Sequence, residues 1–172
     1  IGAGGRFGAI HSQSPTPWFL GVPGLKIVCP SNPGDARTLL KAAIRDDNPV
    51  LFFEHKRLYG LEGEVNGTGV DSIVGRLGEA AVVREGSDVT IVTAMKSVHD
   101  ALEAAEQLER DRISAEVIDL RTLRPIDVDT VLASVRKTNR VAVVEEGPLT
   151  GGWAGELLAC VTEQALGHLD DA

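Results

Sequence analysis

Short apolar runs alternate with amphipathic stretches along this chain. Residues 25–30 (LKIVCP) and 49–55 (PVLFFEH) are apolar runs of strand length. The stretch between them, residues 31–48, carries apolar side chains at helical spacing after a Ser-Asn-Pro start that suits a helix N-terminus. A strand, a helix and a strand at this spacing are typical of parallel strands joined by a right-handed crossover.

The same alternation resumes after residue 75. The pattern predicts three strands and three helices, with the strands at 86–94, 113–123 and 140–146 and the helices at 97–111, 127–138 and 151–166. Residues 60–75 contain five glycines and little periodicity, so they are predicted to form a linker.

We therefore predict an α/β protein with a mostly parallel sheet and two units. The first unit is expected at 1–60, the linker at 61–75 and the second unit at 76–172. The chain opens on Ile1, directly in a glycine-rich stretch, so the first unit is expected to be the C-terminal half of a larger domain. The second unit is also expected to be truncated at its end.

Composition narrows the class of protein. The chain has 172 residues, of which 43% are hydrophobic and 24% charged, values that are ordinary for a globular protein. A net charge of −8 argues against a nucleic-acid-binding surface, which needs clustered Lys and Arg. No apolar run approaches membrane-spanning length, and Cys29 and Cys160 both lie in apolar surroundings. We expect two reduced, buried thiols, a reducing compartment such as the cytoplasm, and no membrane or nucleic-acid partner.

His11 is the first candidate for chemistry. It follows the stretch GAGGRFGAI, and an imidazole is the side chain best suited to exchange protons near neutral pH. The glycines could serve a tight turn, or they could let the backbone pass close to a ligand that His11 addresses. His55 ends a predicted strand, a favoured place for site residues, but a charged cluster with Glu54, Lys56 and Arg57 is the simpler reading.

The segment AAIRDDNP (42–49) is the second candidate. It ends a predicted helix, where unpaired carbonyl oxygens gather, and Asp46 and Asn48 add side-chain oxygens. Those oxygens suit a monovalent cation, but an ordinary helix end before Pro49 is the simpler explanation from the residues alone.

Four co-linear segments carry a family resemblance: HSQSPTPWF, the stretch from VPGLKIVCP to RLYG, VIDLRTLRPID, and VAVVEEGP followed by TGGWAGE. Together they resemble the β subunit of the E1 component of 2-oxo acid dehydrogenase complexes, a transketolase-like family that depends on thiamine diphosphate. The resemblance implies a truncated pyrimidine-binding domain followed by a transketolase C-terminal-like domain. It also implies an assembly of two α and two β subunits that acts with a lipoyl-bearing E2 acyltransferase.

The resemblance implies roles for five positions. His11 matches the active-site histidine that assists reductive acylation of the E2 lipoyl group. Ala43, Ile44, Asp46 and Asn48 match potassium-binding positions that act largely through backbone carbonyls. Thiamine diphosphate and its magnesium ion are expected to be held by the α subunit and by β-subunit segments preceding Ile1, so no cofactor residue is assigned here. One departure is TAMKSVHDAL, where the family has a glycine-containing turn.

The expected activity is oxidative decarboxylation of a 2-oxo acid, with pyruvate favoured, in the cytoplasm or, in a eukaryote, the mitochondrial matrix. An acetoin dehydrogenase β subunit or another transketolase-like enzyme is the alternative. The 172-residue chain alone is expected to be inactive, and in that form it would be an interaction module whose acidic surface suits a basic domain of E2.

Overall fold

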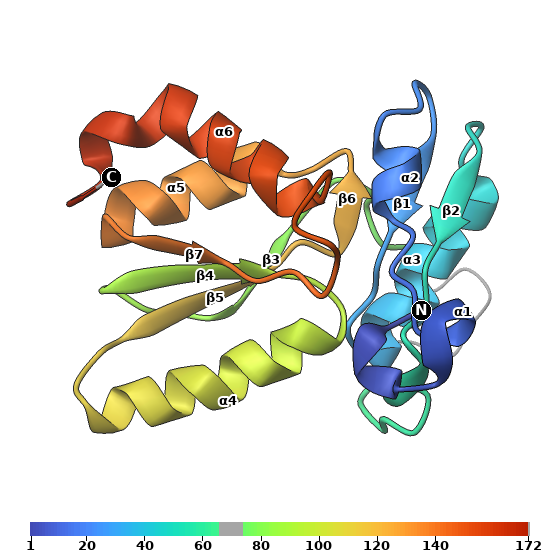
Figure 1. The fold of residues 1–172 in the computed structure, drawn as a ribbon, viewed down its shortest axis with the longest axis horizontal. Coiled ribbons are helices and arrows are strands. Elements are labelled where there is room, and N and C mark those ends of the chain that lie inside the picture. The colour runs from blue at the N-terminus through green and yellow to red at the C-terminus, as the bar shows by residue number, and fades with distance from the viewer. Residues whose placement is uncertain (66–73, 172) are drawn as a thin grey trace.

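The computed structural model of the protein describes residues 1–65 and 74–171. Figure 1 shows two units side by side, each built around a small sheet. The α/β class is confirmed, and the order of long elements follows the predicted alternation.

The first unit contains a three-stranded sheet in the order β2-β1-β6, in which β1 runs parallel to β2 and antiparallel to β6. Asn32 caps the long helix of this unit, because its side-chain oxygen accepts a hydrogen bond from the Asp35 amide at 2.8 Å. The elements of the first half of the chain are η1 (Ala3–Gly5), α1 (Gly8–His11), α2 (Pro17–Leu20), β1 (Lys26–Val28), α3 (Pro33–Arg45), β2 (Val50–Phe52) and η2 (Lys56–Leu58).

The second unit contains a four-stranded sheet in the order β3-β5-β4-β7. Strands β4, β5 and β7 are parallel, and β3 is an antiparallel edge strand. The elements of the second half of the chain are β3 (Ala81–Arg84), β4 (Val89–Thr93), α4 (Lys96–Arg110), β5 (Ala115–Asp119), β6 (Thr122–Arg124), α5 (Val128–Thr138), β7 (Val141–Val143), α6 (Trp153–Ala165) and η3 (Leu166–His168).

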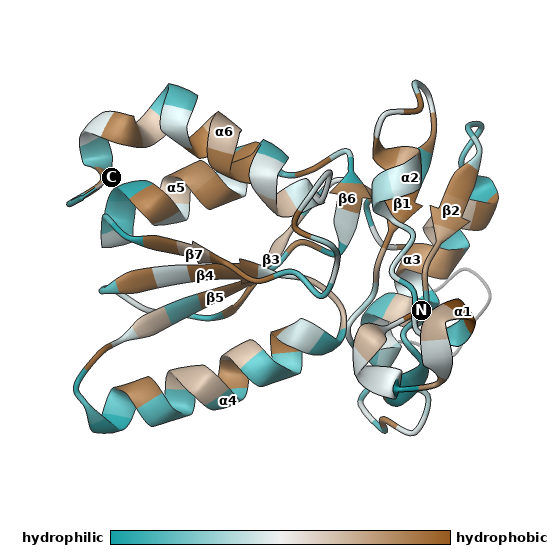
Figure 2. Ribbon diagram, viewed as in Figure 1, coloured by the Kyte–Doolittle hydropathy of each residue, from teal (hydrophilic) through white to brown (hydrophobic). Residues whose placement is uncertain are grey.

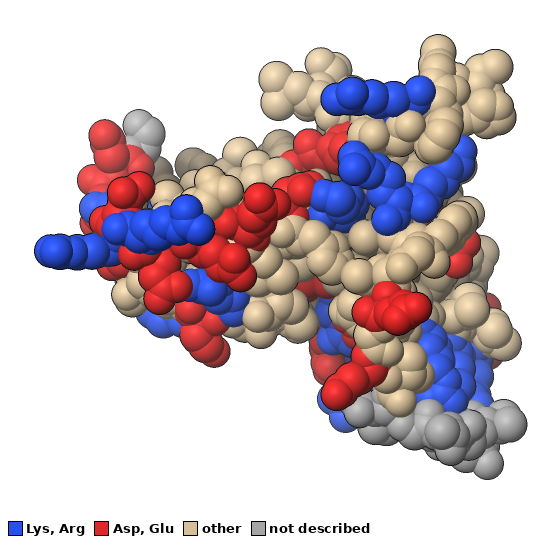
Figure 3. Space-filling model, turned by 90° about the horizontal axis from the view of Figure 1, so that it is seen from below, with Lys and Arg blue, Asp and Glu red and all other residues tan. Residues whose placement is uncertain are grey.

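Helices cover both faces of the four-stranded sheet. In Figure 1 helix α4 lies below the sheet, whereas α5 and α6 lie above it. Figure 2 shows apolar residues along the strands of this sheet, as expected for parallel strands buried on both faces. The buried core between the sheet and helices α5 and α6 includes Val92, Ile118, Val135, Trp153 and Leu157. On the face seen in Figure 3, basic and acidic side chains are interspersed over this half of the molecule.

One predicted strand is wrong. Residues 113–123 do not form a single strand, because Arg121 adopts a left-handed conformation with φ of 59° and turns the chain out of the sheet. The residues that follow form β6, which joins the sheet of the first unit beside β1. Strand β3 and the short helices α1 and α2 were not predicted. The remaining predicted strands are present but shorter than expected.

The turn between β4 and α4 contains no glycine, and Met95 takes a conformation there, with φ of 58°, that favours one. The predicted linker at 61–75 lies partly outside the described residues, which omit 66–73.

Polar contacts join the two units. The buried Ser31 hydroxyl donates to the Asp119 carboxylate at 2.5 Å, and Arg121 pairs with Asp35 at 2.5 Å. The Cys29 amide donates to the Arg121 carbonyl at 2.8 Å. These contacts surround the left-handed turn at Arg121. The turn that directs the chain from β5 to β6 therefore lies at the junction between the two units. None of the helices in the described residues is both long and apolar enough to cross a bilayer.

Candidate functional site

The glycine-rich loop, defined here as residues 2–14, carries His11 at the end of α1. The His11 side chain is exposed, and within residues 1–65 and 74–171 its imidazole has no hydrogen-bond partner. Exposed Phe7 and Ile10 lie on the same loop. The loop therefore presents an available imidazole beside apolar side chains.

Two basic residues that follow β2 donate hydrogen bonds to the backbone of this loop. Lys56 donates from Nζ to the carbonyl of His11 at 3.0 Å, and its ammonium lies 5.4 Å from the centre of the Phe7 ring. Arg57 donates from Nη1 to the Gly4 carbonyl at 3.3 Å. The backbone of the loop is thus fixed at two points, and the His11 side chain on it is exposed.

His55 is buried beneath the loop, with 2% of its surface exposed. Its Nε2 lies 2.6 Å from the Glu146 carboxylate, which follows β7 in the second unit. The sequence favours a charged cluster of His55 with Glu54, Lys56 and Arg57, whereas in the structure the buried His55 ring pairs with Glu146. Both residues lie a few positions after a strand, which is the signal that could have paired them, but the sequence does not show that β2 and β7 end at the same place.

Glu145, the neighbour of Glu146, contacts helix α6 and not His55. Its carboxylate accepts hydrogen bonds from the amides of Trp153 at 3.3 Å and Ala154 at 3.0 Å, so it caps the N-terminus of α6. Burial raises the pKa of Glu145, although the two amide donors oppose that effect.

The candidate cation residues lie at the end of α3. Ala43 and Ile44 are in its last turn, and the Asp46 carboxylate is already paired with the ammonium of Lys26. The Asn48 backbone and side-chain amides both donate to Asp46 at 2.9 Å. Hydrogen bonding with Lys26, supported by Asn48, lowers the pKa of Asp46 to about 2. Within the described ranges, no group of three or more His, Cys, Asp or Glu side chains is arranged to hold a metal ion.

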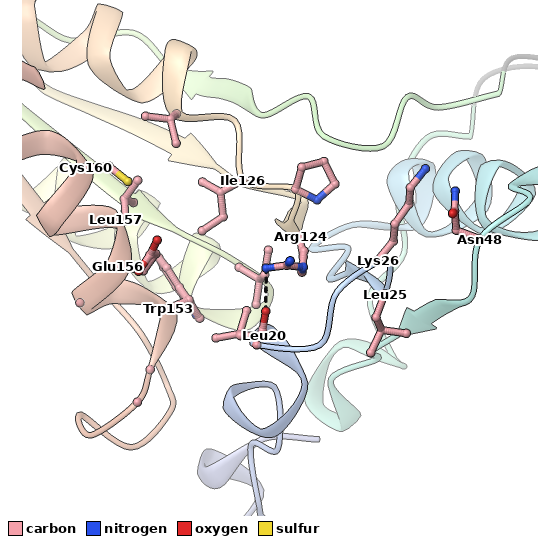
Figure 4. A pocket seen from close by; sticks show the side chains of 18 of the residues that line it. Leu20, Leu25, Lys26, Asn48, Arg124, Ile126, Trp153, Glu156, Leu157 and Cys160 are labelled. Atoms are coloured by element: carbon pink, nitrogen blue, oxygen red, sulfur yellow. Dashed lines mark hydrogen bonds between the residues drawn. The ribbon is translucent and has the colours of Figure 1, made fainter.

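A groove of about 970 Å³ lies between the two units. Figure 4 shows Leu20 and Leu25 from the first unit facing Trp153 and Leu157 of α6 across it. Arg124 of β6 donates to the Leu20 carbonyl at 2.7 Å on the floor of the groove. Cys160, expected to be buried, is half-buried and lines this groove, whereas Cys29 is fully buried.

Two family descriptions match the chain in tandem. The family described as the pyrimidine-binding domain of transketolase matches residues 1–62, and the one described as the transketolase C-terminal domain matches residues 78–172. The chain belongs to the transketolase family. The predicted family resemblance is confirmed.

Relatives of this transketolase-family chain include three β subunits. The chain is 53% identical over 169 residues to the β subunit of acetoin:2,6-dichlorophenolindophenol oxidoreductase from Cupriavidus necator, covering 98% of this chain and 49% of that protein. It is 50% identical over 169 residues to the 2-oxoisovalerate dehydrogenase β subunit of Bacillus subtilis, covering 97% and 51%. It is 49% identical over 170 residues to a mitochondrial pyruvate dehydrogenase E1 component subunit beta-1 from Arabidopsis thaliana, covering 98% and 47%.

A solved structure has the same fold. It is described as a split-gene transketolase, an inactive beta4 tetramer, and it matches with a TM-score of 0.74 and 27% sequence identity, covering 90% of this chain and 50% of that one. The transketolase-family chain therefore spans about half the length of the relatives it matches.

Proposed function

We propose that this chain is part of the β subunit of an E1 enzyme that oxidatively decarboxylates a 2-oxo acid, with pyruvate favoured, and acylates the lipoyl group of E2. The observation that carries the proposal is the co-linear identity of about half to E1-type β subunits across both matched domains. The proposed domain division remains 1–60, 61–75 and 76–172.

In this proposal His11 delivers a proton during reductive acylation. The acyl carbon bonds to one sulfur of the lipoyl ring, the S–S bond breaks, and the other sulfur leaves as a thiolate that takes a proton. Decarboxylation supplies the two electrons. The exposed imidazole of His11 is carried by a backbone whose carbonyl is held by Lys56, which suits a proton donor that meets a mobile substrate arm.

The proposed cofactor is thiamine diphosphate with magnesium. The described residues do not fit the magnesium-diphosphate end of the cofactor, because they contain no cluster of metal-ligating side chains. We propose that this end is held by the α subunit and by parts of the β subunit outside this chain, and we derive no step through it. The proposed partners are the α subunit, a second β subunit and lipoyl-bearing E2, in the cytoplasm or the mitochondrial matrix.

The test of His11 uses the whole β subunit assembled with its α subunit. We expect His11→Ala to lower acylation of E2 lipoyl groups by roughly a hundredfold, within the usual range for a general acid, and to lower decarboxylation with an artificial oxidant much less. His168→Ala is the matched control, since His168 is also exposed but lies at the other end of the chain. Equal rates for His11→Ala and the parent in both assays would remove His11 from the mechanism.

Acetoin cleavage is the second candidate function. The identity of 53% to an acetoin oxidoreductase β subunit favours it to the same degree as the other relatives favour 2-oxo acids. Rates of the assembled enzyme with pyruvate, with a branched-chain 2-oxo acid and with acetoin decide between them. Turnover of acetoin alone would replace the leading proposal.

We also propose that potassium binds at Ala43, Ile44, Asp46 and Asn48, mainly through backbone carbonyls at the end of α3. Because the Lys26 ammonium already neutralises Asp46, the carbonyl oxygens would provide most of the binding. Potassium at ten times its dissociation constant should stabilise the protein by about 1.4 kcal/mol. Equal melting temperatures in potassium and choline chloride of the same strength would exclude the site.

A further inference from the structure

The hydrogen bond between His55 and Glu146 has a defined donor and acceptor. The backbone amide of Arg57 donates to Nδ1 of His55 at 3.2 Å, so Nδ1 is the acceptor of the ring. That leaves Nε2 to carry the proton and to donate it to the Glu146 carboxylate 2.6 Å away. His55 thus joins the end of β2 in the first unit to the end of β7 in the second through one oriented hydrogen bond.

Glu146 also binds the glycine-rich loop. Its second carboxylate oxygen accepts the backbone amide of Gly4, and its main-chain carbonyl accepts the Ser14 hydroxyl at 3.0 Å. The two contacts hold the loop near both of its ends, on either side of His11. A single carboxylate therefore binds the buried histidine and the loop at the same time.

Gly2 shows how closely the loop follows His55. A side chain at position 2 would overlap the His55 ring, and the φ of Gly2 is 125°, a conformation that other residues rarely adopt. The glycine lets the backbone lie directly on the imidazole. At Gly2, the glycine is needed because the backbone passes close to a side chain of the protein itself.

We infer that His55 and Glu146 are positioning residues for His11. The pair fixes the loop from beneath, while Lys56, next to His55, holds the carbonyl of His11 itself. This inference rests on the role proposed for His11 above. The contacts of the pair with the loop are to Gly4 and Ser14 and not to His11, so both residues would act through the placement of the His11 imidazole. A displacement of about 1 Å in a catalytic group is enough to cost roughly a hundredfold in rate.

The experiment compares variants of the whole β subunit, assembled with its α subunit, by amide hydrogen exchange over residues 2–14. His55→Asn keeps an acceptor for the Arg57 amide but does not reach Glu146, whereas His55→Gln places an amide N–H near the position of Nε2. We expect exchange of the loop to quicken at least roughly tenfold in His55→Asn and in Glu146→Ala, and to return towards the parent rate in His55→Gln.

Glu145→Gln is the matched control, because the Glu145 carboxylate accepts its hydrogen bonds from the start of α6 and not from the loop; exchange over 2–14 in this variant should equal that of the parent. The ratio of lipoyl acylation to decarboxylation with an artificial oxidant should fall about tenfold in His55→Asn and recover in His55→Gln. Unchanged loop exchange in His55→Asn, the same defect in His55→Gln, or faster exchange with an unchanged ratio would each overturn the inference.

The two proposals fail in different ways. If the parent assembly acylates no lipoyl group, the proposed function is wrong, and the exchange rates still show whether the pair holds the loop. If the parent acylates lipoyl groups and the exchange rates do not respond to His55→Asn, only the positioning role is wrong.

Discussion

Asp119 is a carboxylate that the fold buries completely at the end of β5. Burial raises its pKa to about 6, although the Ser31 hydroxyl and the Arg121 amide donate hydrogen bonds to it. The folded protein therefore keeps a proton that the unfolded chain releases near pH 4. Stability falls as the pH rises from about 4 to about 6, and above that window the buried charge costs about 3 kcal/mol.

We expect Asp119→Asn to remove this dependence. The amide oxygen can still accept from the Arg121 amide, and the NH₂ group can donate to the Ser31 hydroxyl. The free energy of unfolding in urea should exceed that of the parent by up to about 3 kcal/mol at pH 7.5 and should match it near pH 4. The same difference at both pH values would show that folding does not raise the pKa of Asp119.

Asp127 is a control, because its pKa is shifted in the opposite direction from that of Asp119. Burial raises its pKa, but the amides of Ala80 and Thr130 outweigh that effect, so the pKa is lowered overall. Its stabilising contribution is present at neutral pH and is lost as the pH falls through the folded pKa. Asp127→Asn should therefore destabilise the protein by about 1 kcal/mol at pH 7.5, the usual cost of weakening such a cap, and by less near pH 3.

At the scale of elements, the approach to β4 depends on one glycine. Gly86 lies so close to the backbone of Ala115 and Glu116 in β5 that a side chain there would overlap main-chain atoms. Main-chain atoms of a central strand cannot move aside, so we expect Gly86→Ala to lower the free energy of unfolding in urea by about 3 kcal/mol.

Gly155 is the control for that substitution. It lies inside α6 with no atom near the place of its missing side chain, so Gly155→Ala should raise the free energy of unfolding by about 1 kcal/mol through helix propensity. A smaller loss for Gly86→Ala than about 1 kcal/mol would mean that the turn before β4 can relax.

The long elements could be predicted because each carries its own pattern. Helix α3 has an Asn-Pro start and a helical apolar spacing, and the β4, β5 and β7 region alternates with helices at regular intervals. The break at Arg121 could not be predicted, because TLR is as good a strand sequence as the residues before it. A local hydrogen bond from the Arg121 amide to the Asp119 carboxylate supports the turn, and two tertiary contacts fix it: the pairing of Arg121 with Asp35 and the pairing of β6 with β1.

The candidate site was predicted only in part, for a related reason. The availability of His11 follows from its glycine-rich surroundings, and the structure places it on an exposed turn. The pairing of His55 with Glu146 spans 91 residues and depends on where two strands end in space. No spacing in the sequence encodes that distance.

At the scale of the whole molecule, the two units share both a strand and a set of buried polar contacts. We therefore expect one cooperative unfolding transition rather than two. Trp153 is 4% exposed in the core of the second unit, so its fluorescence reports that unit, and Trp18→Phe removes the exposed tryptophan of the first. Far-UV circular dichroism reports both units. Coincident urea midpoints for the two signals are the expected result, and separated midpoints would show that the units fold independently.

Strand β6 follows the second unit's β5 in sequence but pairs with β1 in the sheet of the first unit. This arrangement limits where segments of two related proteins can be joined in a chimera. A chimera joined in the glycine-rich connector would set the β1 strand of one parent against the β6 strand of the other. The facing positions Ile27 with Arg124, and Val28 with Thr122, would then come from different ancestors. The two halves are therefore not interchangeable parts, and a workable crossover must carry β1 and β6 from the same source.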